Sequence, residues 1–298
     1  MKKFRVEKMV VFSVLAASLA VSCPVVPAGA NAPAATSNVP VQPTPIQWAS
    51  SFSAAQQQAR ATGKLIMIDF YTDWCGWCQL LDTDTYPDSR VKILAAHFVP
   101  LKLDAEKGGA TLAKKYNIDA YPIIVFVDAD GKVVKRIEGY QDGSDFTESL
   151  SQILQDRSGK QLSAAAANQP KDVEAQVAMT IMNAALGKIE EAEKFRRQAE
   201  TADPHNQSGM LGAVYQALAD YYFYDKNDYG KSVDCLTNQI RVSNNGEETI
   251  IAQLMLGYSY IHLQQKSKAI APLQSVLNNS GASKDAKDLA QELLDSAK

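Results

Sequence analysis

The segment that most constrains this chain runs from Lys64 to Gln79 and reads KLIMIDFYTDWCGWCQ. Its apolar, β-branched run at 65–70 predicts a buried strand that ends at the polar residues before the cysteines. Cys75 and Cys78 therefore lie where a strand turns into a helix. Two cysteines on a first helical turn can close a disulfide, and Cys75 would meet the positive field of the helix N-terminus. Because that field favours thiolate over thiol, we expect Cys75 to be the nucleophile and Cys78 the resolving thiol.

A C-x-x-C pair also occurs in zinc sites, which normally use four side chains. The other candidate ligands are Cys235 and the three histidines, His97, His205 and His262, and none forms a second close pair. A redox pair is therefore the preferred interpretation. No metal and no cofactor is predicted beyond the Cys75–Cys78 disulfide.

Two segments resemble the thioredoxin family. IDFYTDWCGWC resembles the active-site segment, and YNIDAYPIIVFVDADGKVVKRIEGY resembles the segment that holds a cis-proline and a closing hairpin. The resemblance covers about residues 45–157. Within the family, the WCGWCQ start looks most like the periplasmic thiol-carrying domains that end membrane electron transporters. The resemblance to the thioredoxin family implies an α/β thioredoxin-like domain, with a central mixed sheet flanked by helices.

The strand before the cysteines carries an acid, Asp69, that would face the core beneath the active-site helix. Desolvation there would raise the pKa of its carboxyl group. The resemblance implies that Asp69 assists proton transfer to Cys78 and that Lys102 lies near the buried acid. For Asp69, the alternative is an acid on an edge strand that reaches solvent. For Lys102, the alternative is a solvated lysine on a strand.

Further residues are assigned to substrate binding by the resemblance. Trp74, Gly76 and Trp77 surround the cysteines, and the Tyr121–Pro122 bond is expected to be cis, with its backbone pairing with a substrate strand. Trp77 departs from the family, in which proline follows the glycine. That departure leaves the redox potential open, and Trp77 is either a substrate contact or a partly buried helix aromatic.

The N-terminus, a basic stretch followed by a short apolar run, predicts a bacterial export signal over residues 1–30. Ala28, Gly29 and Ala30 form a small-x-small cleavage site. Alternatively, the segment LAVSC resembles a lipoprotein box, in which Cys23 would be acylated. An uncleaved membrane anchor is a third alternative. The protein is thus predicted to be periplasmic or secreted, touching a membrane only if Cys23 is lipidated.

Composition limits the partners. The 298 residues are 46% hydrophobic and 21% charged, which suits a globular chain with room for two domains. Losing residues 1–30 removes four basic residues and one acidic residue, so the net charge of −3 becomes −6. An acidic mature chain argues against nucleic acid as a partner.

Beyond about residue 171 the pattern becomes helical, without strands. Leu256, Gly257, Tyr260, Ala269 and Leu273 have the spacing of a tetratricopeptide repeat, so we expect tetratricopeptide-like helical repeats. Such repeats form a concave face that binds extended protein segments. Candidates for that face, or for the core between helices, are Tyr215, Tyr221, Tyr222, Phe223, Tyr224 and Tyr229. Cys235 reads as a small buried hydrophobe. The predicted division is a signal peptide (1–30), a Pro-rich linker (31–45), a thioredoxin-like domain (46–157), a linker (158–171) and a helical repeat domain (172–298).

Together these features predict an exported thiol–disulfide oxidoreductase that reduces protein disulfides through Cys75-Gly76-Trp77-Cys78. A membrane electron transporter would donate electrons, and the repeats would dock protein partners. Asp69 and the Cys-Gly start favour reduction. Two alternatives remain: a non-catalytic adaptor or holdase for extended polypeptides, and a disulfide oxidase or isomerase.

Overall fold

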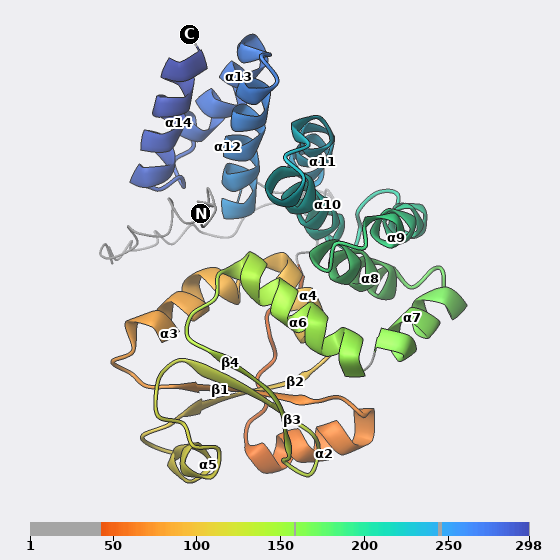
Figure 1. The fold of residues 1–298 in the computed structure, drawn as a ribbon, viewed down its shortest axis with the longest axis vertical. Coiled ribbons are helices and arrows are strands. Elements are labelled where there is room, and N and C mark those ends of the chain that lie inside the picture. Colours follow the sequence, from red (N-terminus) through yellow and green to blue (C-terminus); the bar gives the residue numbers. More distant parts are fainter. Residues whose placement is uncertain (1–42, 158, 244–245, 298) are drawn as a thin grey trace, which may run out of the picture.

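The computed structural model describes residues 43–157, 159–243 and 246–297 (Figure 1). The predicted export signal, Cys23 and all but the end of the Pro-rich linker lie outside the described residues. Within the described part, no helix is both long and apolar enough to cross a membrane.

A four-stranded mixed sheet forms the centre of the first part of the chain, in the order β2-β1-β3-β4. Strand β1 (Ile66–Tyr71) pairs in parallel with β2 (Val99–Asp104). The antiparallel strands β3 (Ile123–Val127) and β4 (Val133–Glu138) continue the sheet on the other side of β1. The central position of β1 buries it on both sides, as its apolar sequence predicts.

Helices cover both faces of this sheet (Figure 1). Helices α2 (Phe52–Thr62) and α5 (Ala110–Lys115) lie on one face. The other face carries α3 (Gly76–Leu80), the π-helix η2 (Leu81–Thr85), α4 (Ser89–Ala95) and α6 (Gly143–Arg157). The expected thioredoxin-like arrangement, a mixed sheet flanked by helices, is confirmed.

Strand β1 sends alternate side chains into two cores, because successive residues of a strand point to opposite faces. Ile66, Ile68 and Phe70 pack with residues of α2 and α5. Met67 belongs to the core that includes α4 and α6. Asp69 has the same parity as Met67, so its carboxyl group lies on the face covered by α3, α4 and α6.

The rest of the chain is helical. It comprises α7 (Gly159–Asn168), α8 (Val173–Ala185), α9 (Ile189–Ala202), α10 (Leu211–Asp220), the π-helix η3 (Tyr221–Asp225), α11 (Tyr229–Val242), α12 (Glu247–His262), α13 (Lys266–Asn278) and α14 (Lys284–Ala297). Helix α7 lies within the segment predicted as a linker. Helix α8 packs against α4 and α6, α10 packs against α4, and one apolar core runs through both parts of the chain.

The aromatic cluster of the helical region is mainly core. Five of the six side chains that were candidates for a concave binding face are at most 7% exposed, and these are Tyr215, Tyr221, Tyr222, Phe223 and Tyr224. Tyr229 is half-buried and packs edge-on against Phe223. Packing between helices, rather than partner binding, accounts for this run.

Candidate active site

The two cysteines of the C-x-x-C pair lie between β1 and α3, where the sequence places them. Cys75 is the N-cap residue of α3, and its Cα atom is 5.3 Å from that of Cys78, with which it forms a disulfide. The backbone N–H of Cys78 donates a hydrogen bond to the sulfur of Cys75 over 3.1 Å. When the disulfide opens, this N–H and the helix N-terminus stabilise negative charge on Cys75.

A buried acid, Asp69, lies on the face of the sheet that α3 covers. Asp69 is fully buried, and the strand register places it opposite Lys102 of β2 and Ile124 of β3. The ammonium of Lys102 is 3.5 Å from a carboxylate oxygen of Asp69. Burial raises the pKa of Asp69 to about 6, and Lys102 offsets only part of that effect. An acid with such a pKa can accept and return a proton near neutral pH.

Asp82 and Tyr86, which the sequence analysis does not single out, complete this polar cluster. Lys102 forms a second ion pair with Asp82, whose side chain is half exposed, so the lysine joins the buried acid to the surface. Its ammonium also lies 5.4 Å from the ring centre of Tyr86. Burial and the charge of Asp69 raise the pKa of Tyr86 well above its usual value. The spacing of Asp82, four residues after Cys78, is a sequence signal for a shared helix face.

One rim of the disulfide is formed by Trp74 and the loop before β3. Trp74 is 68% exposed, and its indole N–H donates to Glu106 over 3.0 Å. Its ring meets that of Tyr121 edge-on, with centroids 5.8 Å apart. The Tyr121–Pro122 peptide bond is cis, as the resemblance implies. The tryptophan thus presents an apolar surface, held by a polar anchor, beside the bond that is expected to face substrate.

A second exposed tryptophan, Trp77, lies between the two cysteines in the sequence. Its side chain is 56% exposed, so it is not the partly buried aromatic that the sequence left open. Its ring lies 5.7 Å from that of Tyr140, which follows β4. Gly76 is exposed, with no atom within 4 Å of the position that a Cβ would take. Cys75 is 4% and Cys78 2% exposed, so the disulfide itself is buried, while the two tryptophans and Gly76 beside it are exposed.

The described residues contain no cluster of three or more histidine, cysteine and acidic side chains able to hold a metal ion. Cys235 is free and buried in α11, where burial raises the pKa of its thiol to about 12. Burial also lowers the pKa of His97 to about 4. Cys235 therefore behaves as the small buried hydrophobe that the sequence predicts.

Known proteins resemble the first part of this chain. Residues 52–154 match the family model of a thioredoxin-like domain. The thiol:disulfide interchange protein DsbD of Ralstonia nicotianae is 34% identical over 109 residues, which is 35% of this chain and 18% of that protein. DsbD of Yersinia pestis is 34% identical over 97 residues, covering 31% of this chain and 16% of the relative. This chain thus spans less than a fifth of the length of either protein.

Among solved structures, a thioredoxin from Thermus thermophilus is 24% identical, with a TM-score of 0.35. The match covers 39% of this chain and 93% of that one. The family model ends at residue 154, before the helical region begins.

Proposed function

Since residues 52–154 form a thioredoxin-like domain, we propose that this chain is an exported thiol–disulfide oxidoreductase that reduces disulfide bonds in proteins. The observation that carries the proposal is the Cys75–Cys78 disulfide at the start of α3, with the carboxyl group of Asp69 buried on the same face of the sheet. A structural disulfide needs neither the ionisable group behind it nor two exposed tryptophans beside it.

The first step uses the reduced protein. The Cys75 thiolate attacks one sulfur of the substrate disulfide, a mixed disulfide forms, and the other substrate sulfur leaves as a thiolate. The N–H of Cys78 and the helix N-terminus lower the energy of the attacking thiolate. Trp74 and Trp77 supply apolar surface for the polypeptide that carries the disulfide.

The second step releases the substrate. Cys78 loses its proton to Asp69, attacks the sulfur of Cys75 and expels the second substrate thiolate. Two electrons have then passed from the protein to the substrate, and the Cys75–Cys78 disulfide is restored. Lys102, between Asp69 and Asp82, stabilises the carboxylate before it takes the proton.

Electrons must return to Cys75–Cys78 after each cycle. We assign that task to a membrane electron transporter, on the likeness of residues 52–154 to part of the DsbD proteins. Export rests on the sequence of residues 1–30. The helical region is assigned to docking protein partners, on the repeat spacing around Gly257.

Insulin reduction in the presence of dithiothreitol tests the enzyme. We expect the wild-type chain and the matched control Cys235→Ala to accelerate insulin precipitation, and Cys75→Ser/Cys78→Ser to lose that acceleration. Equal activity of the double variant would refute the enzyme and favour the adaptor or holdase, whose binding needs no thiols. Trapping with Cys78→Ala, which leaves Cys75 in mixed disulfides, would identify the substrates.

The direction of the reaction needs a separate measurement. Equilibration of Cys75–Cys78 with a glutathione or dithiothreitol buffer gives its reduction potential. We expect a value in the range of reducing thioredoxins, about −270 mV. A value near that of strong oxidants, about −120 mV, would overturn reduction in favour of an oxidase or isomerase.

A further inference from the structure

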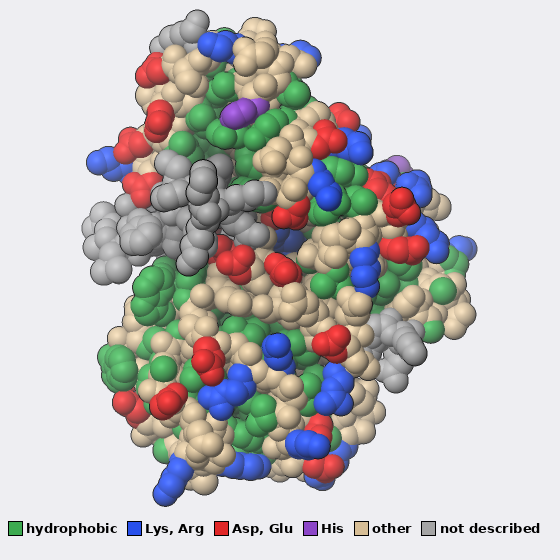
Figure 2. All heavy atoms as spheres, viewed as in Figure 1, with side chains coloured by type: hydrophobic (Ala, Val, Ile, Leu, Met, Phe, Trp, Pro, Cys, Tyr) green, Lys and Arg blue, Asp and Glu red, His purple; other side chains and the backbone are tan. Residues whose placement is uncertain are grey.

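A cavity of about 350 Å³ lies where the thioredoxin-like part meets the helical region. Asp84 and Tyr140 line it from the thioredoxin-like part, and Gln216, Glu247 and Glu248 line it from α10 and α12. Figure 2 shows acidic side chains gathered along this boundary. We call it the junction cavity. Its volume is within the usual range for sites that bind small groups.

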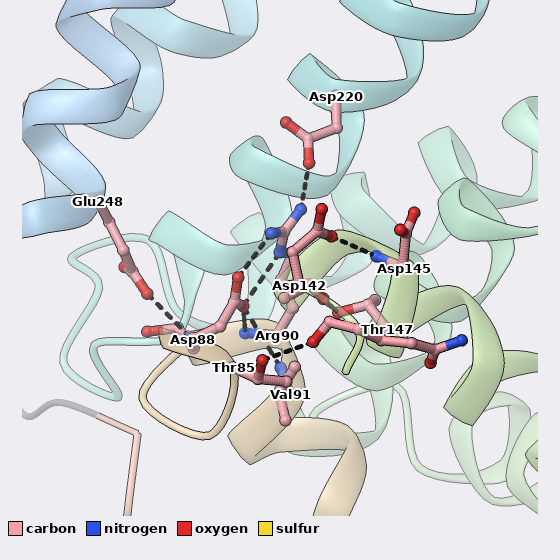
Figure 3. A network of polar contacts seen from close by, with 12 residues as sticks. Thr85, Asp88, Arg90, Val91, Asp142, Asp145, Thr147, Asp220 and Glu248 are labelled. Atoms are coloured by element: carbon pink, nitrogen blue, oxygen red, sulfur yellow. Dashed lines mark hydrogen bonds and ion pairs between the residues drawn. The ribbon is translucent and has the colours of Figure 1, made fainter. Parts of the chain in front are cut away.

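The junction cavity carries excess negative charge. Its lining contains five carboxyl groups, from Asp84, Asp88, Asp142, Glu247 and Glu248, and one basic side chain, from Lys92. Asp88 is neutralised by the buried Arg90, which also pairs with Asp220 (Figure 3). Among the described residues, neither Asp84 nor Glu247 has an ion pair with a lysine or arginine. The pKa of Glu247 is raised by burial and by the charges of Asp84 and Glu248.

A second, independent feature is an unsatisfied acceptor. Gln216 is 5% exposed and lines the cavity, yet its side-chain oxygen has no hydrogen-bond partner among the described residues. A buried acceptor without a donor is energetically unfavourable. A ligand that brings N–H donors would remove that cost and would also neutralise the neighbouring carboxylates.

The junction cavity adjoins the redox pair. Tyr140 lines the cavity, and its ring centre lies 5.7 Å from that of Trp77. Trp77 is the residue that precedes Cys78 in the C-x-x-C motif. The hydroxyl of Tyr140 donates to Asp84 at 3.5 Å. Asp84 belongs to η2, which continues the active-site helix. The contact between Trp77 and Tyr140 thus connects the C-x-x-C motif to the lining of the cavity.

We propose that the junction cavity receives a lysine or arginine side chain of the protein whose disulfide Cys75 attacks. This inference rests on the proposed function and narrows its substrate class to disulfides that have a basic residue nearby. The carboxylates of Asp84 and Glu247 accept its N–H groups from two sides, and the oxygen of Gln216 accepts a third. Acidic segments are repelled by the same charges.

Disulfide-bonded peptides of one sequence test this inference with the reduced full chain. In the neutral reference peptide, norleucine occupies every variable position. Each further peptide has one of these norleucines replaced by lysine, at a different position before or after the cysteine. Stopped-flow tryptophan fluorescence gives each second-order rate constant. We expect the peptide with lysine at one particular position to react about tenfold faster than the neutral peptide, as for a close charge pair. This difference in rate constant should disappear in about 1 M salt.

Variants then locate the effect. Glu247→Gln is expected to reduce the lysine preference at least about threefold, whereas the matched control Glu190→Gln, on the exposed face of α9, keeps it. Should the Glu247→Gln chain not fold, Asp84→Asn makes the same test. Reaction of the neutral peptide with no favoured lysine position overturns the inference and leaves the proposed function standing.

If no peptide reacts, the proposed function fails, and binding alone tests the cavity. A cysteine-free peptide with the same lysine positions is titrated against the oxidised chain by fluorescence anisotropy. Binding that is weakened by Glu247→Gln supports a basic-residue site. No binding by any of these peptides overturns it.

Discussion

Replacing Asp69 by asparagine is expected to make the folded chain more stable at neutral pH and slower in thiol exchange. Burial raises the pKa of Asp69 from 3.8 to about 6. At about 1.36 kcal/mol per pKa unit, keeping this carboxylate ionised inside the folded protein costs about 3 kcal/mol. Asparagine carries no charge and avoids that cost. Lys102 keeps Asp82 as a partner, so the substitution does not leave a buried lysine unpaired.

The pH dependence gives the sharper test. The pKa is higher in the folded than in the unfolded chain, so the folded state holds the proton more tightly. The wild type therefore loses stability as pH rises through about 4 to 6, and regains it on acidification. The advantage of Asp69→Asn should be about 3 kcal/mol at about pH 7.5 and about 1 kcal/mol at about pH 4.5.

Urea unfolding of the oxidised chain at these two pH values measures both differences. The matched control is Asp156→Asn, an exposed position in α6, which should show no such change. If Asp69 is the proton acceptor, release of substrate from a preformed mixed disulfide should slow by about 100-fold in Asp69→Asn. A stability difference that is the same at both pH values would refute the assigned burial cost. Unchanged release kinetics would refute the proton transfer.

Three further substitutions test the packing of the chain. Arg90→Met removes the buried cation that pairs with Asp88 and Asp220 and should cost about 3–5 kcal/mol of unfolding free energy in urea titrations. Cys235→Ala removes a buried thiol and should cost about 1–2 kcal/mol, with insulin reduction unchanged. Gly257→Ala would place a Cβ 2.5 Å from Leu273 and should destabilise the chain by about 1–3 kcal/mol. Gly108→Ala is its control, since no atom lies within 4 Å there, and equal stability of the two variants would contradict the close approach.

Local chemistry explains what the sequence predicts well. Ser51 caps α2 by accepting a hydrogen bond from the N–H of Ala54, and Gly63 ends the helix with φ 70°. Both roles follow from residue type and spacing alone. The burial of Asp69 is predictable for a similar reason, because a central strand with one acid among apolar residues leaves that acid no route to solvent.

Long-range pairing explains what the sequence misses. Arg90 bonds to Asp220, 130 residues away, and so ties α4 to α10 (Figure 3). Nothing local distinguishes this arginine from an exposed one, although it is 2% exposed. The aromatic cluster of the helical region is a similar case. Its residue types suit a binding face and a core equally well, and only the packing of the helices shows that Tyr221 and Tyr222 belong to the core.

The π-helix η2 shows why the functional site extends beyond the motif. The α-helix that begins after Cys75 ends at Leu80, and the chain continues as a π-helix from Leu81. Such a turn is set by its surroundings and is frequent at functional sites. Within it, Asp82 pairs with Lys102 beside the buried acid, and Asp84 meets Tyr140 at the junction cavity. We therefore expect a substitution at Asp82 to alter the proposed proton transfer, and a substitution at Asp84 to alter the proposed preference for a basic residue in the substrate.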